Sequence, residues 1–115
     1  MTSSNHKGKA YERCIARLLR TRGLNAERQS QFCAGQKQGS DVVAGSWAIE
    51  CKHVQTLNLK AALEQVREAA TATGRTYAVV FRWSARGRPT FPEGQDFICL
   101  RLCDAWALFQ DNQER

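Results

Sequence analysis

The chain has no long hydrophobic run and no apolar N-terminal segment. None of the apolar stretches in its 115 residues approaches the roughly 20 residues that a membrane-spanning helix needs. Residues 1–7 are mostly polar and lack the hydrophobic region of a secretory signal peptide. We therefore expect a protein that makes no membrane contact and acts in the cytoplasm, whether its gene belongs to a cell or to a phage.

Paired cysteines are also missing. The five cysteines form no Cys-x-x-Cys motif, and an odd number cannot make a complete set of disulfides. Cys14, Cys51 and Cys99 fall within apolar patterns, where cysteine usually acts as a small buried hydrophobic residue. Cys99, Cys103 and the isolated His53 do not match a typical zinc site. The cysteines therefore indicate neither a disulfide scaffold nor structural zinc.

Acidic residues are scarce relative to basic ones. The chain has 17 Lys and Arg against 11 Asp and Glu, which gives a formal net charge of +6. Such an excess favours a polyanionic partner, above all nucleic acid, although a small basic domain can simply have solvated basic faces. With no internal repeat and no linker-like stretch, the length suits one domain over residues 1–115, of which we expect 1–6 to be flexible.

The stretch 39–52 predicts a β-hairpin that brings charged residues together. Two short strands flank a tight turn at Gly45-Ser46. Because side chains alternate along a strand, Glu50 and Lys52 share one face. The other face is apolar and is expected to face the core, with Trp47, Ile49 and Cys51. Antiparallel pairing of the two strands would place Asp41 beside Glu50 and Lys52.

Two carboxylates and an ammonium group at one place suit the hydrolysis of phosphodiesters. Hard divalent cations such as Mg²⁺ and Mn²⁺ bind carboxylate oxygens and keep several waters. A lysine beside such a cation can orient or deprotonate an attacking water. The alternative is structural, because Glu-x-Lys on a strand is commonly a solvated charge pair and an aspartate after Gly-Ser commonly belongs to a turn. The basic charge of the chain favours the catalytic interpretation.

Two amphipathic helices are predicted. The first covers residues 7–22, and its apolar stripe consists of Tyr11, Cys14, Ile15, Leu18 and Leu19. Glu12 lies in its first turns, where a carboxylate either interacts with the helix dipole or provides a third acidic group for a metal. The second helix follows Asn58 as its N-cap and ends near Gly74.

The remaining segments complete an α/β pattern. A polar edge strand is expected within residues 24–32, and 53–57 is expected to be a connector. Residues 76–83 form the most hydrophobic segment, which predicts a strand at the centre of the sheet, parallel to the strand before the second helix.

The C-terminal part is expected to close the fold. A long basic loop over residues 84–95 precedes a last strand at 97–102. Asp104 is placed to cap a short helix over 105–110, in which Trp106 and Phe109 are expected to pack against the rest of the chain. The predicted order is therefore α-β-β-β-α-β-β-α.

This order, with acidic residues on the first helix and on the second and third strands, resembles the PD-(D/E)xK nuclease superfamily. More narrowly, it resembles the archaeal-type Holliday junction resolvases. The motifs that carry the resemblance lie at residues 7–13, 40–45, 48–52 and 63–66. The likeness covers residues 7–83 and implies a restriction-endonuclease-like mixed β-sheet flanked by helices. Two features depart from the family, because Ser40 replaces the signature proline and the 84–95 loop is not an obvious family element.

The resemblance implies a role for each residue of the hairpin site. Asp41 and Glu50 would bind Mg²⁺ or Mn²⁺, and Cys51 would add its backbone carbonyl. Lys52 would position the attacking water, while Glu12 would support the metal directly or through a water. The implied activity is structure-selective DNA cleavage that resolves Holliday junctions. The alternatives are a related nuclease for nicked, flapped or foreign duplex DNA, and a catalytically inactive module that binds nucleic acid.

Branched DNA and a second copy of the chain are the expected partners. The candidates for phosphate contacts are Lys7, Lys9, Arg13, Arg17, Arg28, Lys37 and Arg86. No recognition helix of a sequence-specific reader stands out, which favours selection by DNA structure. Two symmetric cuts need two active sites, so the family implies a C2 homodimer. Four aromatic residues suit its interface, although core packing explains them equally well: Trp83, Phe91, Phe97 and Trp106.

Overall fold

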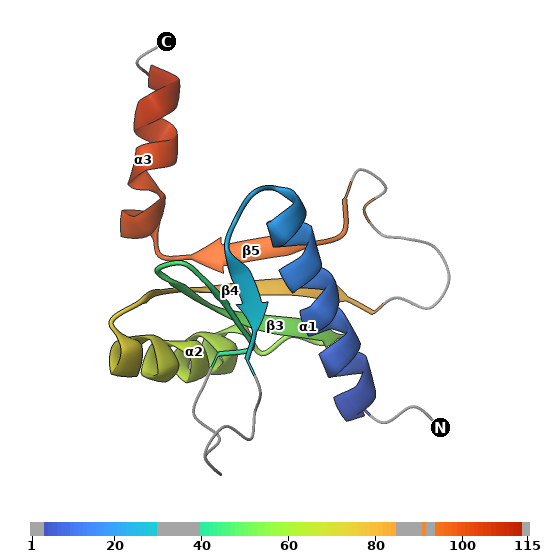
Figure 1. Ribbon diagram of the computed structural model, residues 1–115. Helices are drawn as coiled ribbons and strands as arrows, with labels where there is room; N and C mark the ends of the chain where they lie inside the picture. Colours follow the sequence, from blue (N-terminus) through green and yellow to red (C-terminus); the bar gives the residue numbers. More distant parts are fainter. Residues whose placement is uncertain (1–3, 30–39, 85–90, 92–93, 114–115) are drawn as a thin grey trace.

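A five-stranded mixed sheet lies between two helices, and a third helix extends from its edge (Figure 1). This computed structural model describes residues 4–29, 40–84, 91 and 94–113, with the backbone alone for 4–7 and 111–113. The elements are α1 (Ser4–Thr21), β1 (Ala26–Arg28), β2 (Val42–Ala44), β3 (Trp47–Val54), α2 (Leu59–Thr73), β4 (Thr76–Trp83), β5 (Phe97–Leu100) and α3 (Leu102–Gln113). The α/β class and the order of elements are those predicted, although several boundaries differ.

The strands follow each other across the sheet in sequence order. Strand β3 lies in the middle, antiparallel to β2 and parallel to β4, while β5 pairs antiparallel with β4. The predicted parallel pairing is therefore confirmed, and 76–83 is an interior strand with a neighbour on each side, although β3 occupies the middle position. Both faces of strand β4 are covered: Val79 packs beneath α2, and Val80 belongs to the cluster beneath α1. A strand covered on both faces is apolar along its length.

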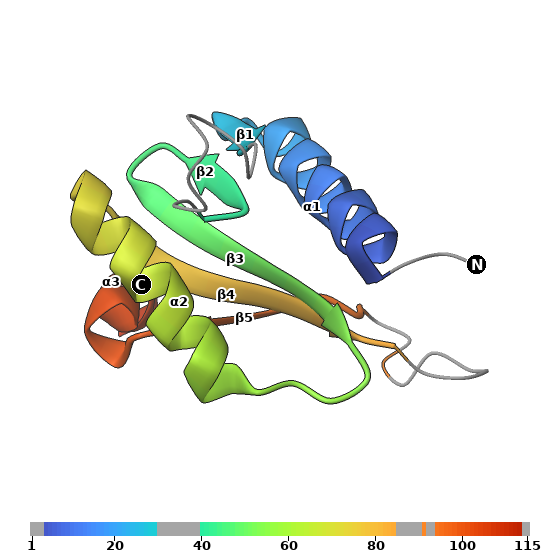
Figure 2. The same cartoon turned by 90° about the horizontal axis from the view of Figure 1, so that it is seen from below.

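The helices α1 and α2 cover opposite faces of the sheet (Figure 2). The cluster beneath α1 contains Tyr11, Ile15, Ala16, Ala26, Val42, Ile49, Cys51 and Val80. The cluster beneath α2 contains Ala48, Ala62, Val66, Ala70, Val79 and Phe81. The core therefore has two layers, and the β3 face that carries Glu50 is covered as well as the apolar face expected from the sequence.

The buried side of α1 is rotated relative to the predicted stripe. Tyr11 is buried as predicted, but Cys14 and Leu18 are exposed. Glu12 and Ala16, four residues apart and thus on one side of the helix, are buried instead. The hydrophobic pattern alone misses this rotation because it assigns a carboxylate to the solvent side.

The predicted turn and caps are confirmed. The β2–β3 hairpin turns at Gly45, whose positive φ of 59° suits glycine. The Asn58 side chain accepts a hydrogen bond from the Ala61 amide at 3.1 Å at the start of α2. Gly74 ends α2 in the left-handed region with φ 69°. Local chemistry therefore determines where these elements begin and end.

Other boundaries follow the tertiary structure. Strand β1 is an edge strand as predicted, but it contains only three residues. Strand β3 continues to Val54, so the expected connector at 53–57 begins later. Its parallel partner β4 extends the pairing to this point, because Val54 lies opposite Trp83.

The C-terminal helix differs most from expectation. It begins at Leu102, and Asp104 lies inside its first turn, where its carboxylate accepts a 3.0 Å hydrogen bond from Arg101. Trp106 and Phe109 are 54% and 53% exposed, so the prediction that they pack against the rest of the chain is wrong. The reason is visible in Figure 1, where α3 extends away from the sheet instead of folding back over it.

The described cysteines are all free. Cys51 is buried as predicted, and Cys99 is partly buried against the cluster beneath α2. Cys14 is exposed, contrary to the prediction, because α1 is rotated. Within the residues that the structure describes, no helix has both the length and the apolar character needed to cross a membrane.

Candidate active site

The β2–β3 hairpin brings Asp41 and Glu50 together. Val42 pairs with Ile49 in the antiparallel register, so the residue before β2 lies opposite Glu50. The Asp41 carboxylate accepts a 2.8 Å hydrogen bond from the backbone N–H of Cys51. Both acidic residues are buried, with Glu50 only 2% exposed. The hairpin therefore places two carboxylates inside the protein at one end of a short strand pair.

Lys52 lies on the same side of β3 as Glu50. Its Nζ is 3.4 Å from Glu50 Oε2, and its side chain is 32% exposed. The second oxygen of Glu50, Oε1, is buried and has no hydrogen-bond partner among the described residues. A buried acceptor without a partner is costly unless another group binds it. The site thus contains one ammonium group that reaches solvent and one carboxylate oxygen that is free to bind a ligand.

Burial and neighbouring groups change the pKa values of the two carboxyl groups. Desolvation and, after it, the charge of Asp41 raise the pKa of Glu50 to about 7, against the opposing effect of Lys52. Desolvation also raises the pKa of Asp41, against the effects of the Cys51 N–H and of Lys52. Both groups are therefore less stable as anions than ordinary surface carboxylates. A bound cation would relieve this strain.

Glu12 approaches the same site from α1. It is buried, and its Oε1 accepts a 3.0 Å hydrogen bond from Nε of Arg28 on β1. Desolvation raises the pKa of Glu12, the charge of Asp41 adds to the effect, and Arg28 and Lys9 oppose it. Asp41 is thus close enough to Glu12 to contribute to its raised pKa. Its direct partner is Arg28.

The donors available to a metal are limited but chemically suitable. Among the described residues, no three His, Cys, Asp or Glu side chains converge closely enough to hold an ion by themselves. Asp41 and Glu50 provide two carboxylates, and Mg²⁺ commonly binds through one or two carboxylates while waters and substrate oxygens complete its shell. The N–H and C=O of one residue lie on the same edge of a strand. The Cys51 carbonyl therefore faces the Asp41 side, past the last β2 pairing at Val42.

Comparison with known proteins identifies the family. Residues 3–82 match the family model described as archaeal Holliday junction resolvase (Hjc). The chain belongs to this family. The solved structure of Hjc from Archaeoglobus fulgidus, a Holliday junction resolvase from an archaeal hyperthermophile, shares 25% sequence identity. The match covers 84% of this chain and 85% of that chain, with a TM-score of 0.53. No curated protein matches the chain significantly in sequence.

Membership of the Hjc family confirms the predicted class of function and the predicted fold class. The chain is a structure-selective, junction-resolving nuclease with the resolvase fold. The four residues proposed for catalysis, Glu12, Asp41, Glu50 and Lys52, all lie within the matched residues. Strand β5 and helix α3 lie beyond the end of that match. The C-terminal elements are thus outside the part that identifies the family.

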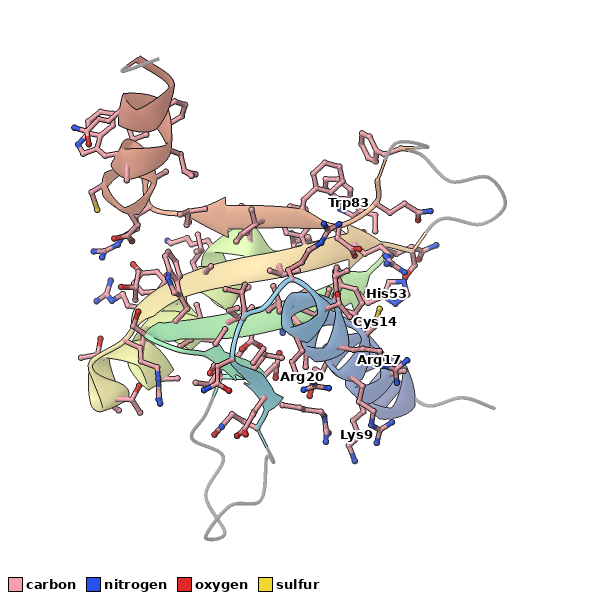
Figure 3. The ribbon with its side chains drawn as sticks, turned by 45° about the horizontal axis from the view of Figure 1, so that its top comes forward. Lys9, Cys14, Arg17, Arg20, His53 and Trp83 are labelled. Atoms are coloured by element: carbon pink, nitrogen blue, oxygen red, sulfur yellow. The ribbon has the colours of Figure 1, made fainter. Side chains whose placement is uncertain are left out.

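Basic side chains form a stripe along helix α1. Lys9, Arg13 and Arg17 are spaced four residues apart and therefore lie along one side of the helix. Arg13 and Arg17 are exposed, and Figure 3 shows Lys9 and Arg17 extending from α1. Among the other predicted phosphate contacts, Lys37, Arg86 and the side chain of Lys7 fall outside the described residues. Arg28 forms an ion pair with Glu12, so its side chain is part of the acidic site.

Sequence reasoning missed a hydrogen-bonded network beside the site. Asp96 accepts a 2.8 Å hydrogen bond from the Tyr11 hydroxyl and two bonds from Arg82, at 3.0 and 2.9 Å. The Tyr11 ring lies 5.3 Å from the ring of His53, between centroids. Tyr11 precedes Glu12, and His53 follows Lys52, so the network holds the neighbours of two site residues. No local motif signals it, because Tyr11 and Asp96 are 85 residues apart in the sequence.

The departure at Ser40 leaves the hairpin intact. Ser40 is buried, and its hydroxyl donates a 3.2 Å hydrogen bond to the Val42 carbonyl. This bond spans the residue between them, Asp41, and so constrains the backbone just before β2. The serine thus supports locally the turn at which the family signature has a proline.

Proposed function

We propose that the chain resolves four-way DNA junctions by metal-dependent hydrolysis of phosphodiesters at Asp41, Glu50 and Lys52, in the cytoplasm. The observation that carries this proposal is a pair of buried carboxylates with an ammonium group 3.4 Å from one of them. A surface charge pair would leave its carboxylate in water. Burial with a strongly raised pKa is instead typical of functional sites.

Asp41 and Glu50 are the side chains that would hold Mg²⁺ or Mn²⁺. Their oxygens, with the Cys51 carbonyl, form the hard donor set that such ions prefer. The unpartnered Glu50 Oε1 supports this fit, since it needs a partner that the described protein does not provide. An ion held there would supply Lewis-acid stabilisation of the negative charge on the scissile phosphate. Glu12 lies beside the set and would join it directly or through a water.

Lys52 contributes a fixed positive charge at the solvent side of the site. Contact with Glu50 holds the ammonium group in place, and its partial exposure leaves it accessible to an entering phosphate. A positioned cation near the attacked phosphate stabilises the charge that develops in the transition state. The same group can orient the attacking water by donating a hydrogen bond.

Branched DNA is held in this proposal by contacts to its backbone. Lys9, Arg13 and Arg17 on α1 present positive charge on the helix that also carries Glu12. Contacts to phosphates provide affinity and orientation without reading sequence. Two symmetric cuts across a junction require two such sites, so we assign the active form as a homodimer with C2 symmetry.

The test is a cleavage assay on an immobile four-way junction in Mg²⁺, with linear duplex of the same arm sequence as the DNA control. We expect Lys52→Ala to lower cleavage by about two orders of magnitude or more, the range for a positioned catalytic group, while junction binding survives. The matched protein control is Lys60→Ala, which removes an exposed lysine paired with Glu64 on α2. This control should cleave as the wild type does.

Three results would contradict the proposal in different ways. Equal cleavage of junction and duplex would place the chain among nucleases for other DNA structures. Junction binding without cleavage by the wild type in Mg²⁺ or Mn²⁺ would indicate an inactive binding module. Undiminished cleavage by both Lys52→Ala and Glu50→Ala would remove the hairpin from the mechanism.

A further inference from the structure

Trp83 at the end of β4 is exposed although it belongs to a cluster of aromatic rings. Its ring centroid lies 5.2 Å from that of Phe81, 5.6 Å from that of Phe97 and 6.1 Å from that of Phe91. Phe91 and Phe97 also contact each other, with 4.7 Å between their centroids. Phe81 is buried and the other two phenylalanines are partly buried, whereas Trp83 is 39% exposed. The cluster therefore leaves part of Trp83 open to solvent.

The contacts around Trp83 restrict its motion. Three rings pack against the indole, and Trp83 lies opposite Val54 in the ladder between β3 and β4. The backbone N–H of the next residue, Ser84, donates a 2.8 Å hydrogen bond to the Val54 carbonyl. An aromatic side chain that is already ordered loses little conformational freedom when a ligand stacks on it. Trp83 is therefore preorganised as a binding surface.

Trp83 projects from the same face of the sheet as Glu50 and Lys52. In the parallel ladder Lys52 pairs with Phe81, and Val54 pairs with Trp83. Phe81 belongs to the cluster beneath α2, and side chains two residues apart on a strand share a face. With a rise of about 3.3 Å per residue and about 4.8 Å between strands, the Cα atoms of Lys52 and Trp83 lie about 8 Å apart. This distance is the length of about two to three stacked bases.

The size of the exposed surface suits one small planar ligand. Trp83 exposes about 100 Å², which is its exposed fraction applied to the roughly 250 Å² of a large aromatic side chain. A standard protein interface buries about 800 Å² per partner, so one ring is too small a contact for a protein surface. One ring is sufficient to stack with one nucleobase. The other residues on this face of β4 and β5 are buried or partly buried: Tyr77, Val79, Phe81, Phe97 and Cys99.

A nucleobase with a free face occurs where base pairing is interrupted. Within a duplex the neighbouring base pairs cover both faces of each base, so a base must leave the stack before a side chain can stack on it. Extrusion costs least for a base that is already unpaired. Aromatic side chains bind such bases whatever the sequence, because every base has a π-face. A ring of this kind selects DNA by structure, which agrees with a structure-selective nuclease.

We propose that Trp83 stacks on an unpaired nucleobase of branched DNA, close to the phosphate that Lys52 contacts. The net charge of +6 attracts the DNA backbone, and Figure 3 shows Trp83 well apart from Lys9 and Arg17 on α1. The α1 stripe and Trp83 therefore contact different parts of the DNA. The proposal rests on the proposed function in one respect, because it takes Lys52 as the residue beside the scissile phosphate.

The test compares DNA with and without unpaired bases, in EDTA so that binding is measured without cleavage. Fluorescence anisotropy gives the affinity of the full chain for a linear duplex, for the same duplex with a short gap of unpaired thymines, and for the four-way junction. Trp83→Leu retains an apolar side chain beside the phenylalanines but has no ring. We expect it to lower the affinity for the gapped duplex and for the junction by about 5- to 150-fold, the range for one lost base stack. Its affinity for the paired duplex should be unchanged.

Two further variants show whether the ring itself is responsible. Trp83→Phe retains a ring and should recover most of the affinity that Trp83→Leu loses. Leu24→Ala removes apolar surface at an exposed leucine after α1 and should bind all three DNAs as the wild type does. Circular dichroism and thermal melting compare the folding of the variants. A partly unfolded sample would lower both affinities equally, so the preference for gapped over paired DNA is independent of this effect.

The fluorescence of Trp83 tests the contact without changing the residue. The chain has three tryptophans, so Trp47→Phe/Trp106→Phe leaves Trp83 as the only one. Stacking of a base on the indole should quench its emission. We expect the gapped duplex to quench Trp83 more strongly than the paired duplex does when each saturates the protein.

The proposal fails on any of three results. The first is an unchanged affinity of Trp83→Leu for the gapped duplex or for the junction. The second is an equal loss on the paired duplex, which would assign Trp83 to the fold or to backbone contact, and the third is equal quenching by the two duplexes. A protein that cleaves junctions without these preferences refutes only the stacking, whereas one that has the preferences but cannot cleave refutes only the proposed function.

Discussion

Replacing Glu50 by glutamine should stabilise the metal-free protein above neutral pH. The glutamate is almost fully buried, and its pKa is raised from its usual value of 4.5 to about 7. A folded state that holds the proton more tightly than the unfolded state is stabilised at low pH. This contribution is complete below about pH 4.5 and is lost as the pH rises through about 7. Above pH 7 the ionised Glu50 destabilises the folded state.

The size of the effect follows from the shift. One pKa unit corresponds to about 1.4 kcal/mol, so a shift of this size corresponds to roughly 3 kcal/mol for an isolated group. Glutamine removes the buried charge but also the contact with Lys52, whose side chain is about one-third exposed and partly screened by water. We expect a net gain of about 1–2 kcal/mol at pH 8, or several degrees in Tm for a domain of this size.

The assay is urea and thermal unfolding in EDTA at pH 5 and pH 8. The stability difference between Glu50→Gln and wild type should be small at pH 5 and favour the variant at pH 8. Glu64→Gln is the matched control, because Glu64 is an exposed glutamate on α2 whose side chain is 63% accessible. It should show no such pH-dependent gain.

The response of stability to added Mg²⁺ distinguishes a cation-binding site from a buried glutamate that binds no ion. A ligand that binds only the folded state raises its stability. The Tm of the wild type at pH 8 should therefore rise with Mg²⁺, and that of Glu50→Gln should rise less. If Glu50→Gln is no more stable than wild type at pH 8, burial and the charge of Asp41 do not destabilise the ionised Glu50.

Three further predictions concern the surroundings of the site. Arg28→Ala leaves the buried Glu12 carboxylate without its partner, so it should lower the free energy of unfolding, measured by urea unfolding, by about 1–3 kcal/mol. Arg28→Lys should have a smaller effect. An unchanged free energy of unfolding would show that the pair is unimportant for stability. Asp96→Asn weakens the bonds from Tyr11 and Arg82 and should cost about 1–2 kcal/mol by the same measurement. Asp104→Asn should cost less, because it weakens only an ion pair with the exposed Arg101, three residues away. Arg17→Gln should make the plot of log junction affinity against log salt concentration less steep by about 0.9. Arg67→Gln on α2 should leave the slope unchanged. If Arg17→Gln and the wild type have equal slopes, Arg17 does not contact a phosphate.

Features that depend on neighbouring residues could be read from the sequence. Alternation along 47–52 and the turn at Gly45 were sufficient to place Asp41 beside Glu50 and Lys52, since a tight hairpin has only one register that buries its apolar face. The limits of α2 followed from Asn58 and Gly74, whose side chain and backbone preferences act within a few residues. The family resemblance rested on the hairpin residues and on short motifs at 7–13 and 63–66.

Only the tertiary structure decided how these residues are buried and what else contacts them. The covering of β3 by α2 as well as α1 raises the pKa of Glu50, and the pairing of Arg28 with Glu12 joins residues from two elements. The same patterns misplaced α3, because Trp106 and Phe109 show that the helix carries apolar side chains but not whether it folds back onto the sheet. Periodicity is set by local geometry, whereas burial depends on long-range packing between segments distant in sequence.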